Sequence, residues 1–290
     1  MLSASFAQRL ASVLILVCVS GISFALHAQS TEAELNARLK DKALYLRGCW
    51  RDDTLHFNST GQLVGSSTPT SFTLSGFDLE TLHLENDKLV LDGVRVGLKL
   101  ANDKLQRVEL KVNKGLHTKL ENVHIEIEAN STNDYSQALD AIFSDGLMDM
   151  VPTLPSHWQS YAQKHFLSNG ASHSNPPTTG TVLPKQQNSL PNGPRRIGDG
   201  IKPPILLKSV DLMKINDSAR GMNHGEVKVL FNIWIEPDGS ITHISVVRAM
   251  GLGIDEDALN ALRQYVFAPG TLNGKPVLVE LNIEMNHSDL

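Results

Sequence analysis

The chain has 290 residues, of which 41% are hydrophobic and 20% are charged, and its formal net charge is −5. This composition suits ordinary globular domains, and the length leaves room for two of them. A mildly acidic chain gives no electrostatic argument for nucleic acid, so we predict no nucleic-acid partner.

The first 28 residues read as a targeting segment. Arg9 precedes an apolar run from Leu10 to Leu26, and the small residue Ala28 offers a cleavage site before Gln29. We therefore predict export to the periplasm by a signal peptide, residues 1–28. A single-span inner-membrane anchor stays open as the alternative, because the run is just long enough to cross a bilayer.

The two cysteines lie on either side of the predicted cleavage site. Lipidation of Cys18 is a further alternative for the N-terminus, although Val17 is bulkier than the residue that normally precedes a lipidated cysteine. After cleavage only Cys49 remains, so no intrachain disulfide is predicted. We expect Cys49 to be a small buried residue between Leu46 and Trp50.

Residues 31–167 predict a β-rich domain with helices at its C-terminal end. After a short charged segment, hydrophobic runs alternate with turn signals such as Asn86-Asp87 and Asp92-Gly93. The predicted strands are 44–50, 54–57, 72–75, 81–84, 88–91, 94–100, 105–112 and 123–128. Closely spaced strands with polar turns favour a small antiparallel, barrel-like sheet.

Two helices are predicted at the end of this domain. One covers residues 135–143, and the other follows Pro155 and carries Trp158, Tyr161 and Phe166. We expect these aromatic residues to cap the barrel. A ligand mouth lined by them is the alternative, and it would make the protein a soluble periplasmic module for a lipid or another small ligand.

Residues 168–204 predict a linker. Seven prolines, with Ser, Asn, Gly and Thr, replace the periodic hydrophobic residues of the preceding part. Such a segment is semi-rigid and has no core of its own. The last domain is predicted over residues 205–290, with a short helix at 211–220.

The last domain predicts the order strand, strand, helix, strand. Val227, Val229, Phe231, Ile233 and Ile235 alternate with a mostly polar set, which indicates a strand with one buried face. A turn at 237–239 and a second strand at 241–247 complete a hairpin. A helix follows with Asp255 as its predicted N-cap, and alternation returns over 277–285.

This element order fixes a topology. The helix returns the chain so that the third strand pairs antiparallel with the first, which gives the strand order second, first, third. The third strand is then an edge whose backbone donors and acceptors are free to take another strand. The sequence thus predicts an α+β fold with a three-stranded antiparallel sheet at its C-terminal end.

The sequences G-E-V-K-V, I-W-I-E-P-D-G-S-I, D-E-D-A-L-N-A-L, Y-V-F-A-P and N-G-K-P-V-L-V closely resemble the C-terminal domain of the TonB family. One departure is Tyr265, where the family usually has tryptophan. The resemblance implies docking to an outer-membrane transporter or another envelope protein, whose segment adds as a strand beside the third strand. Transferred to this chain, the partner-binding residues are Val277, Leu278, Val279, Glu280, Leu281, Asn282 and Ile283. Pairing of this edge in a homodimer stays open as an alternative.

Two other features of TonB energy transducers match less well. Their membrane anchors carry a serine and a histidine four residues apart; Ser23 and His27 have that spacing but lie at the very end of the apolar run. The family's proline-rich spacer carries charged repeats, and residues 168–204 have none. The resemblance therefore implies a docking domain more strongly than it implies an energy transducer.

The sequence predicts neither an enzyme nor a metal or cofactor site. The eleven histidines are scattered, without metal-site spacing. Gly251-Leu252-Gly253 lacks the third glycine of a dinucleotide fingerprint and reads as a loop into the helix. Glu256 and Asp257 fall in the first helical turn, where negative charge suits the helix dipole.

Overall fold

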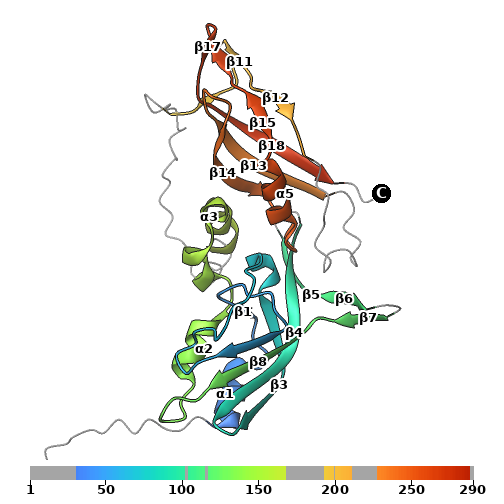
Figure 1. Ribbon diagram of the computed structural model, residues 1–290, viewed down its shortest axis with the longest axis vertical. Coiled ribbons are helices and arrows are strands. Elements are labelled where there is room, and N and C mark those ends of the chain that lie inside the picture. Colours follow the sequence, from blue (N-terminus) through green and yellow to red (C-terminus); the bar gives the residue numbers. More distant parts are fainter. Residues whose placement is uncertain are drawn as a thin grey trace, which may run out of the picture.

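The structure is a computed structural model, and it describes residues 31–101, 104–114, 117–167, 193–198, 200–210 and 227–287. The predicted targeting segment, residues 168–192 of the predicted linker and the predicted helix at 211–220 lie outside these residues. Figure 1 shows two β-rich parts along the long axis, residues 31–167 below and residues 193–287 above.

The N-terminal part is built on an open seven-stranded sheet. Its order is β2-β8-β4-β3-β1-β9, with β5 also paired to β4. The strands are β1 (Leu44–Leu46), β2 (Thr54–Phe57), β3 (Gly76–Glu85), β4 (Lys88–Ala101), β5 (Lys104–Glu109), β8 (Asn122–Glu128) and β9 (Phe143–Asp145). The predicted barrel-like closure is wrong, because β2 and β9 end the sheet and do not pair with each other. The sheet is also mixed, since β2 runs parallel to β8.

Strand β4 was expected as two strands with a turn at Asp92-Gly93, but it is continuous over its 14 residues. Both residues pair within the sheet, opposite Thr81 and Leu79 of β3, where the register shifts by a residue. A β-carbon at Gly93 would overlap the carbonyl oxygen of Asp78. Glycine is therefore present for a close approach of two backbones and not for a turn.

The helices of the N-terminal part are short. They are α1 (Glu32–Leu39), α2 (Ser136–Ile142), α3 (Ser156–Ala162), the 3₁₀ helices η1 (Phe72–Leu74) and η2 (Met148–Thr153), and the π-helical turn η3 (Gln163–Leu167). A capping box between Thr31 and Glu34 starts α1, which buries Leu35 and Leu39. The predicted strand at 72–75 is helical instead, because Ser71 accepts a hydrogen bond from the Thr73 amide.

The remaining described strands of the N-terminal part form a hairpin that projects from the sheet, β6 (Lys111–Lys114) and β7 (His117–Leu120) (Figure 1).

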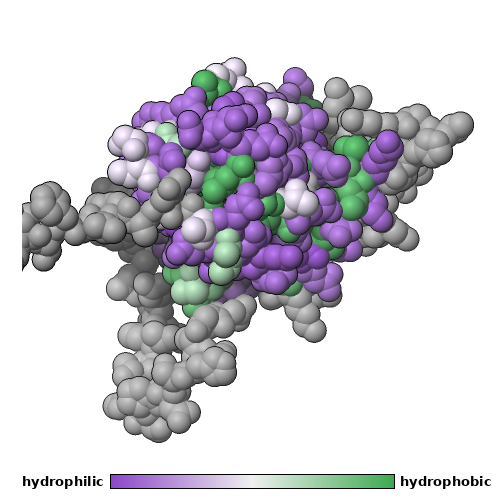
Figure 2. Space-filling model, turned by 90° about the horizontal axis from the view of Figure 1, so that it is seen from below, coloured by the Kyte–Doolittle hydropathy of each residue, from purple (hydrophilic) through white to green (hydrophobic). Residues whose placement is uncertain are grey.

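Figure 2 shows a largely hydrophilic face, on which hydrophobic residues lie in small separate groups. This face offers no broad apolar patch to a partner.

The C-terminal part has a four-stranded sheet of order β10-β18-β13-β14. Its elements are β10 (Arg195–Arg196), β11 (Ile201–Lys202), β12 (Ile205–Lys208), β13 (Val227–Ile235), β14 (Ile241–Arg248), α5 (Ile254–Leu262), β15 (Val266–Ala268), β16 (Thr271–Leu272), β17 (Lys275–Pro276) and β18 (Val279–His287). The predicted order of second, first and third strand is confirmed as β14-β13-β18. Strand β10, from the predicted linker, was not expected in the sheet.

One hydrophobic cluster spans both parts, and a second lies within the N-terminal part. The cluster that holds Phe231 and Ile233 of β13 and Leu259 of α5 also holds Trp158 and Phe166. The expectation that the aromatic residues of α3 and η3 cap a barrel is therefore wrong. They pack against the C-terminal part, and α3 lies beside β14 (Figure 1).

Candidate functional site

The candidate site is the edge of β18 that faces away from β13. Strand β18 pairs with β13 over nine residues, from Val279 to His287. Beyond Glu280 no other strand pairs with its opposite edge among the residues that the structure describes. Among the described residues, the sequence-predicted edge is therefore unpaired only beyond Glu280, because β10 pairs with Val279 and Glu280.

Backbone geometry shows which residues offer those groups. The Arg195 amide donates to the carbonyl of Leu278 over 3.0 Å, so Leu278 is directed to the outer edge. Because successive residues of a strand direct their backbone groups to opposite edges, the even-numbered residues of β18 share this direction. The outer backbone groups beyond β10 therefore belong to Asn282, Glu284 and Asn286.

The two faces of β18 differ in chemistry. Val279 and Met285 are buried, and Leu281 and Ile283 are partly buried against the shared core. Glu280, Asn282 and Glu284 lie on the opposite face, where Asn232 donates hydrogen bonds of 3.0 Å to both Glu280 and Asn282. Of the seven predicted site residues, Val277 and Leu278 precede β18 in the chain, and the other five lie on it.

Strand β10 covers the beginning of this edge. Arg195 and Arg196 pair parallel with Val279 and Glu280. The Arg196 guanidinium also contacts the Glu280 carboxylate at 3.3 Å, with the arginine side chain 85% exposed. An exposed ion pair of this kind contributes little, typically below about 1 kcal/mol.

Comparison with protein families matches residues 217–287 to the Gram-negative bacterial TonB protein C-terminal. This chain carries a TonB C-terminal domain. The matched residues include β13, β14, α5 and β18, which form the sheet edge just described and the helix behind it. No curated protein matches the chain. The family indicates a TonB-type protein of the cell envelope, and it is a family of interaction domains and not of enzymes.

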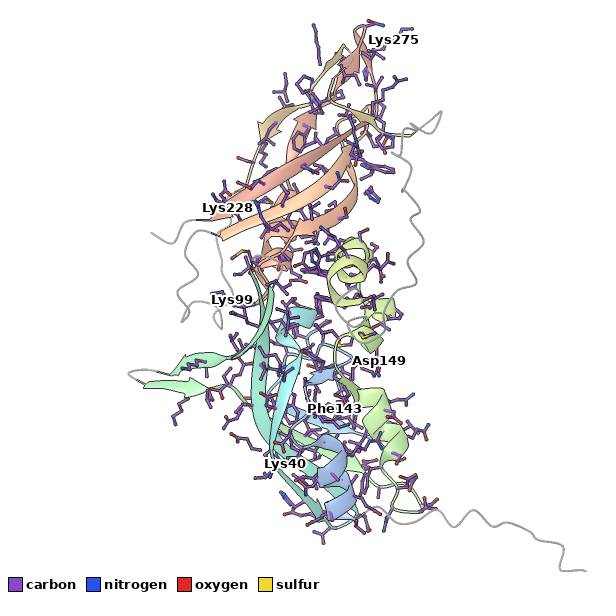
Figure 3. All side chains as sticks on the ribbon, turned by 180° about the vertical axis from the view of Figure 1, so that it is seen from behind. Lys40, Lys99, Phe143, Asp149, Lys228 and Lys275 are labelled. Atoms are coloured by element: carbon purple, nitrogen blue, oxygen red, sulfur yellow. The ribbon has the colours of Figure 1, made fainter. Side chains whose placement is uncertain are left out.

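Besides the shared hydrophobic cluster, the backbone of one loop joins the TonB domain to the N-terminal part. Leu252 donates to the carbonyl of Leu98 at 2.9 Å, and Leu100 donates to the carbonyl of Met250 at 2.8 Å. These bonds add the loop to the end of β4, where Figure 3 labels Lys99. We call this contact, from Met250 to Gly253 against Leu98 to Leu100, the joint.

The joint explains the Gly251-Leu252-Gly253 sequence. All three residues have positive φ, of 79°, 56° and 77°. A β-carbon at Gly251 would overlap the Leu98 carbonyl oxygen and lie 2.9 Å from the Leu98 carbonyl carbon. Glycine is required because two backbones meet there. The spacing of these two glycines signalled a special loop, but it did not reveal which strand the loop meets.

Two carboxyl groups of α5 are buried at the joint. Gly253 is the N-cap, so the prediction of Asp255 is wrong; the Asp255 carboxylate instead accepts from the amides of Met250 at 2.9 Å and Gly251 at 2.6 Å. Glu256 accepts from the Trp158 indole at 2.8 Å. Burial, and then the Glu256 charge, raise the pKa of Asp255 to about 8, although the two amide bonds act in the opposite direction.

Polar side chains of the N-terminal part surround Glu256 of α5. A cavity of about 120 Å³ is lined by residues that include Cys49, Ser71 and His157. Cys49 is half-buried and packs against the shared core, so it is less buried than expected. Burial, and then Glu256, raise the pKa of the Cys49 thiol to about 11, which disfavours a reactive thiolate at neutral pH.

The described residues of the N-terminal part also form a surface hollow. The hollow, of about 530 Å³, is lined mainly by polar and charged residues, among them Arg51, Asp53 and Glu121. Across the described ranges, no group of three or more His, Cys, Asp and Glu side chains is arranged to hold a metal ion. No helix in the described part of the chain is long and apolar enough to cross a membrane.

Proposed function

We propose that this protein docks to an outer-membrane transporter by accepting an extended segment of that partner as a strand beside β18. The observation that carries the proposal is the open edge of β18 beyond Glu280, in a domain whose family acts in envelope protein interactions. Main-chain bonds would supply affinity, and pockets for alternate side chains would supply selectivity.

The faces of β18 suggest what an added strand contains. Alternate side chains of the partner would lie beside Leu281 and Ile283 and cover apolar surface that these two residues leave partly exposed. The intervening side chains would lie beside Asn282 and Glu284 on the solvent face. A segment that alternates apolar with polar or basic residues therefore fits this edge.

The test uses the chain from residue 31 to 290, because the core of the TonB domain is shared with the N-terminal part. We would titrate it with peptides from the periplasmic segments of outer-membrane transporters and follow amide resonances by NMR. The amides of Asn282, Glu284 and Asn286 should shift and exchange more slowly with solvent. No change at these three amides would contradict strand addition by this class of partner.

A proline variant makes the test specific to the backbone. Asn282→Pro removes one outward N–H and leaves the ladder to β13 intact, because prolines are tolerated on the open side of an edge strand. It should weaken peptide binding by about tenfold, the value of about one net hydrogen bond. Asn282→Ala is the matched control, since it removes the same side chain but keeps the amide.

The same amides distinguish a homodimer. If β18 edges paired between two copies, the protection of Asn282 and Glu284 would rise with protein concentration in the absence of peptide. Sedimentation of the chain over the same concentrations would then show a dimer, and docking of a transporter segment at this edge would be refuted.

A further inference from the structure

The short strand β10 occupies the beginning of the edge that the proposed function needs. Arg195 and Arg196 lie parallel to β18 in the register of an added strand, at Val279 and Glu280. They belong to the predicted linker and precede the family match, which begins at residue 217. The edge has therefore already accepted an extended basic segment, supplied by the chain itself.

The hold of β10 on the edge is weak. The strand is two residues long, whereas β13 pairs with β18 over nine residues. Both arginines are exposed, and the ion pair from Arg196 to Glu280 is open to solvent. Such contacts stabilise an element by little, so β10 can be displaced without loss of the core.

The pairing of β10 with β18 ends at Arg196, two residues before Gly198, whose φ of 139° lies outside the range of a strand. Ile197 itself is 53% exposed. If the pairing continued, Ile197 would lie beside Leu281. Residues 195–197 are thus two basic residues followed by an apolar one, an order that fits the edge.

The position of β10 in the chain raises its local concentration. Only residues 197–200 separate it from β11, which is paired with β16 at Ile201 and Lys202. A short tether of this kind holds a segment near its site at an effective concentration on the order of millimolar. A free segment of equal intrinsic affinity would have to reach that concentration to compete.

We infer that Arg195–Arg196 is a resident strand, which occupies the beginning of the β18 edge until a basic and apolar segment of a partner takes its place. Glu280 then selects a basic residue at this position, first from Arg196 and afterwards from the partner. This inference rests on the proposed function for the identity of the partner. The occupancy of the edge by β10 is independent of that identity.

The test weakens the pairing of β10 with β18 in the chain from residue 31 to 290. Arg195→Pro removes the amide that donates to the Leu278 carbonyl, and Arg195→Ala is the matched control that keeps it. The probe is a synthetic peptide with the sequence of residues 191–198, labelled with a fluorophore. Its affinity is measured by anisotropy, and exchange of the Glu280 amide is measured by NMR.

We expect the Arg195→Pro chain to bind this peptide about tenfold more tightly than the wild-type and Arg195→Ala chains, the effect of about one net hydrogen bond. The Glu280 amide, which faces the Arg195 carbonyl in a parallel pair, should exchange about tenfold faster in the Arg195→Pro chain alone. A peptide with glutamate in place of Arg196 should bind weakly, and Glu280→Arg should restore its binding.

Equal peptide affinity in all three chains, or unchanged exchange of the Glu280 amide, would overturn the inference. So would a peptide that binds none of the chains, because the edge would then take no strand in trans. Transporter segments that bind wild-type and Arg195→Pro chains equally would support docking and refute the resident strand. If the chain's own peptide binds but the transporter segments do not, the proposed docking partner is refuted and the resident strand is not.

Discussion

Replacement of Gly251 by alanine tests whether the joint depends on backbone contact. Gly251 has φ of 79°, and a β-carbon there would overlap the Leu98 carbonyl. The positive φ costs an alanine about 1–2 kcal/mol. Separation of the two backbones would also weaken two hydrogen bonds of the joint, Leu252 to Leu98 and Leu100 to Met250, at about 1 kcal/mol each. The free energy of unfolding should fall by about 3–4 kcal/mol.

Gly274 offers a matched control. Its φ of 78° is nearly that of Gly251, but nothing lies within 4 Å of the position of its β-carbon. Gly274→Ala should therefore lower the free energy of unfolding only by the cost of the positive φ, about 1–2 kcal/mol. Urea unfolding, monitored by tryptophan fluorescence and circular dichroism, gives both values. If Gly251→Ala costs no more than Gly274→Ala, close backbone contact does not determine the stability of the joint.

Three further predictions concern buried polar groups. Trp158→Phe leaves the Glu256 carboxylate without its indole donor and should lower the free energy of unfolding by about 1–3 kcal/mol in the same urea assay. Because the folded-state pKa of Asp255, about 8, lies above its unfolded value, stability should decline as pH rises from 4 to 8; Asp255→Asn should flatten that decline in thermal unfolding measured across this range. Arg95 is fully buried against Glu121 and donates to three backbone carbonyls, so Arg95→Met should cost about 3–5 kcal/mol, visible as a lower unfolding temperature.

The sheet of the TonB domain could be predicted because its signals are local. Alternation along β13 and β18, and the turn at Pro237 to Gly239, fix strands and their direction over short spans of chain. The edge position of β18 followed from that order, whereas its residues were predicted to bind a partner from the resemblance to the TonB family. Period-two alternation separates the side chains of β18 into two faces, but the hydrogen bond from Arg195 to Leu278 was needed to show which backbone groups point to the open edge.

The features that the sequence did not reveal are contacts between distant segments. The two-residue strand β10 has no periodicity to detect, and its partner lies more than 80 residues away at Val279. Asp92-Gly93 resembles a turn because glycine serves both turns and close backbone contacts. The sequence predicted that Trp158 is buried, but only the tertiary structure shows that it packs in the cluster that contains α5 and donates to Glu256.

The joint also limits how this protein can be recombined. Its specificity lies in main-chain groups, Gly251 and the carboxyl groups of Asp255 and Glu256, in addition to the hydrophobic cluster that the two parts share. A TonB domain grafted from another protein would fit the N-terminal part only if its loop carried glycine at the position of Gly251 and its helix presented an acceptor to Trp158. Chimaeras that keep Gly251 to Glu256 from this chain should assemble, whereas those that exchange this segment should leave both halves with exposed apolar faces.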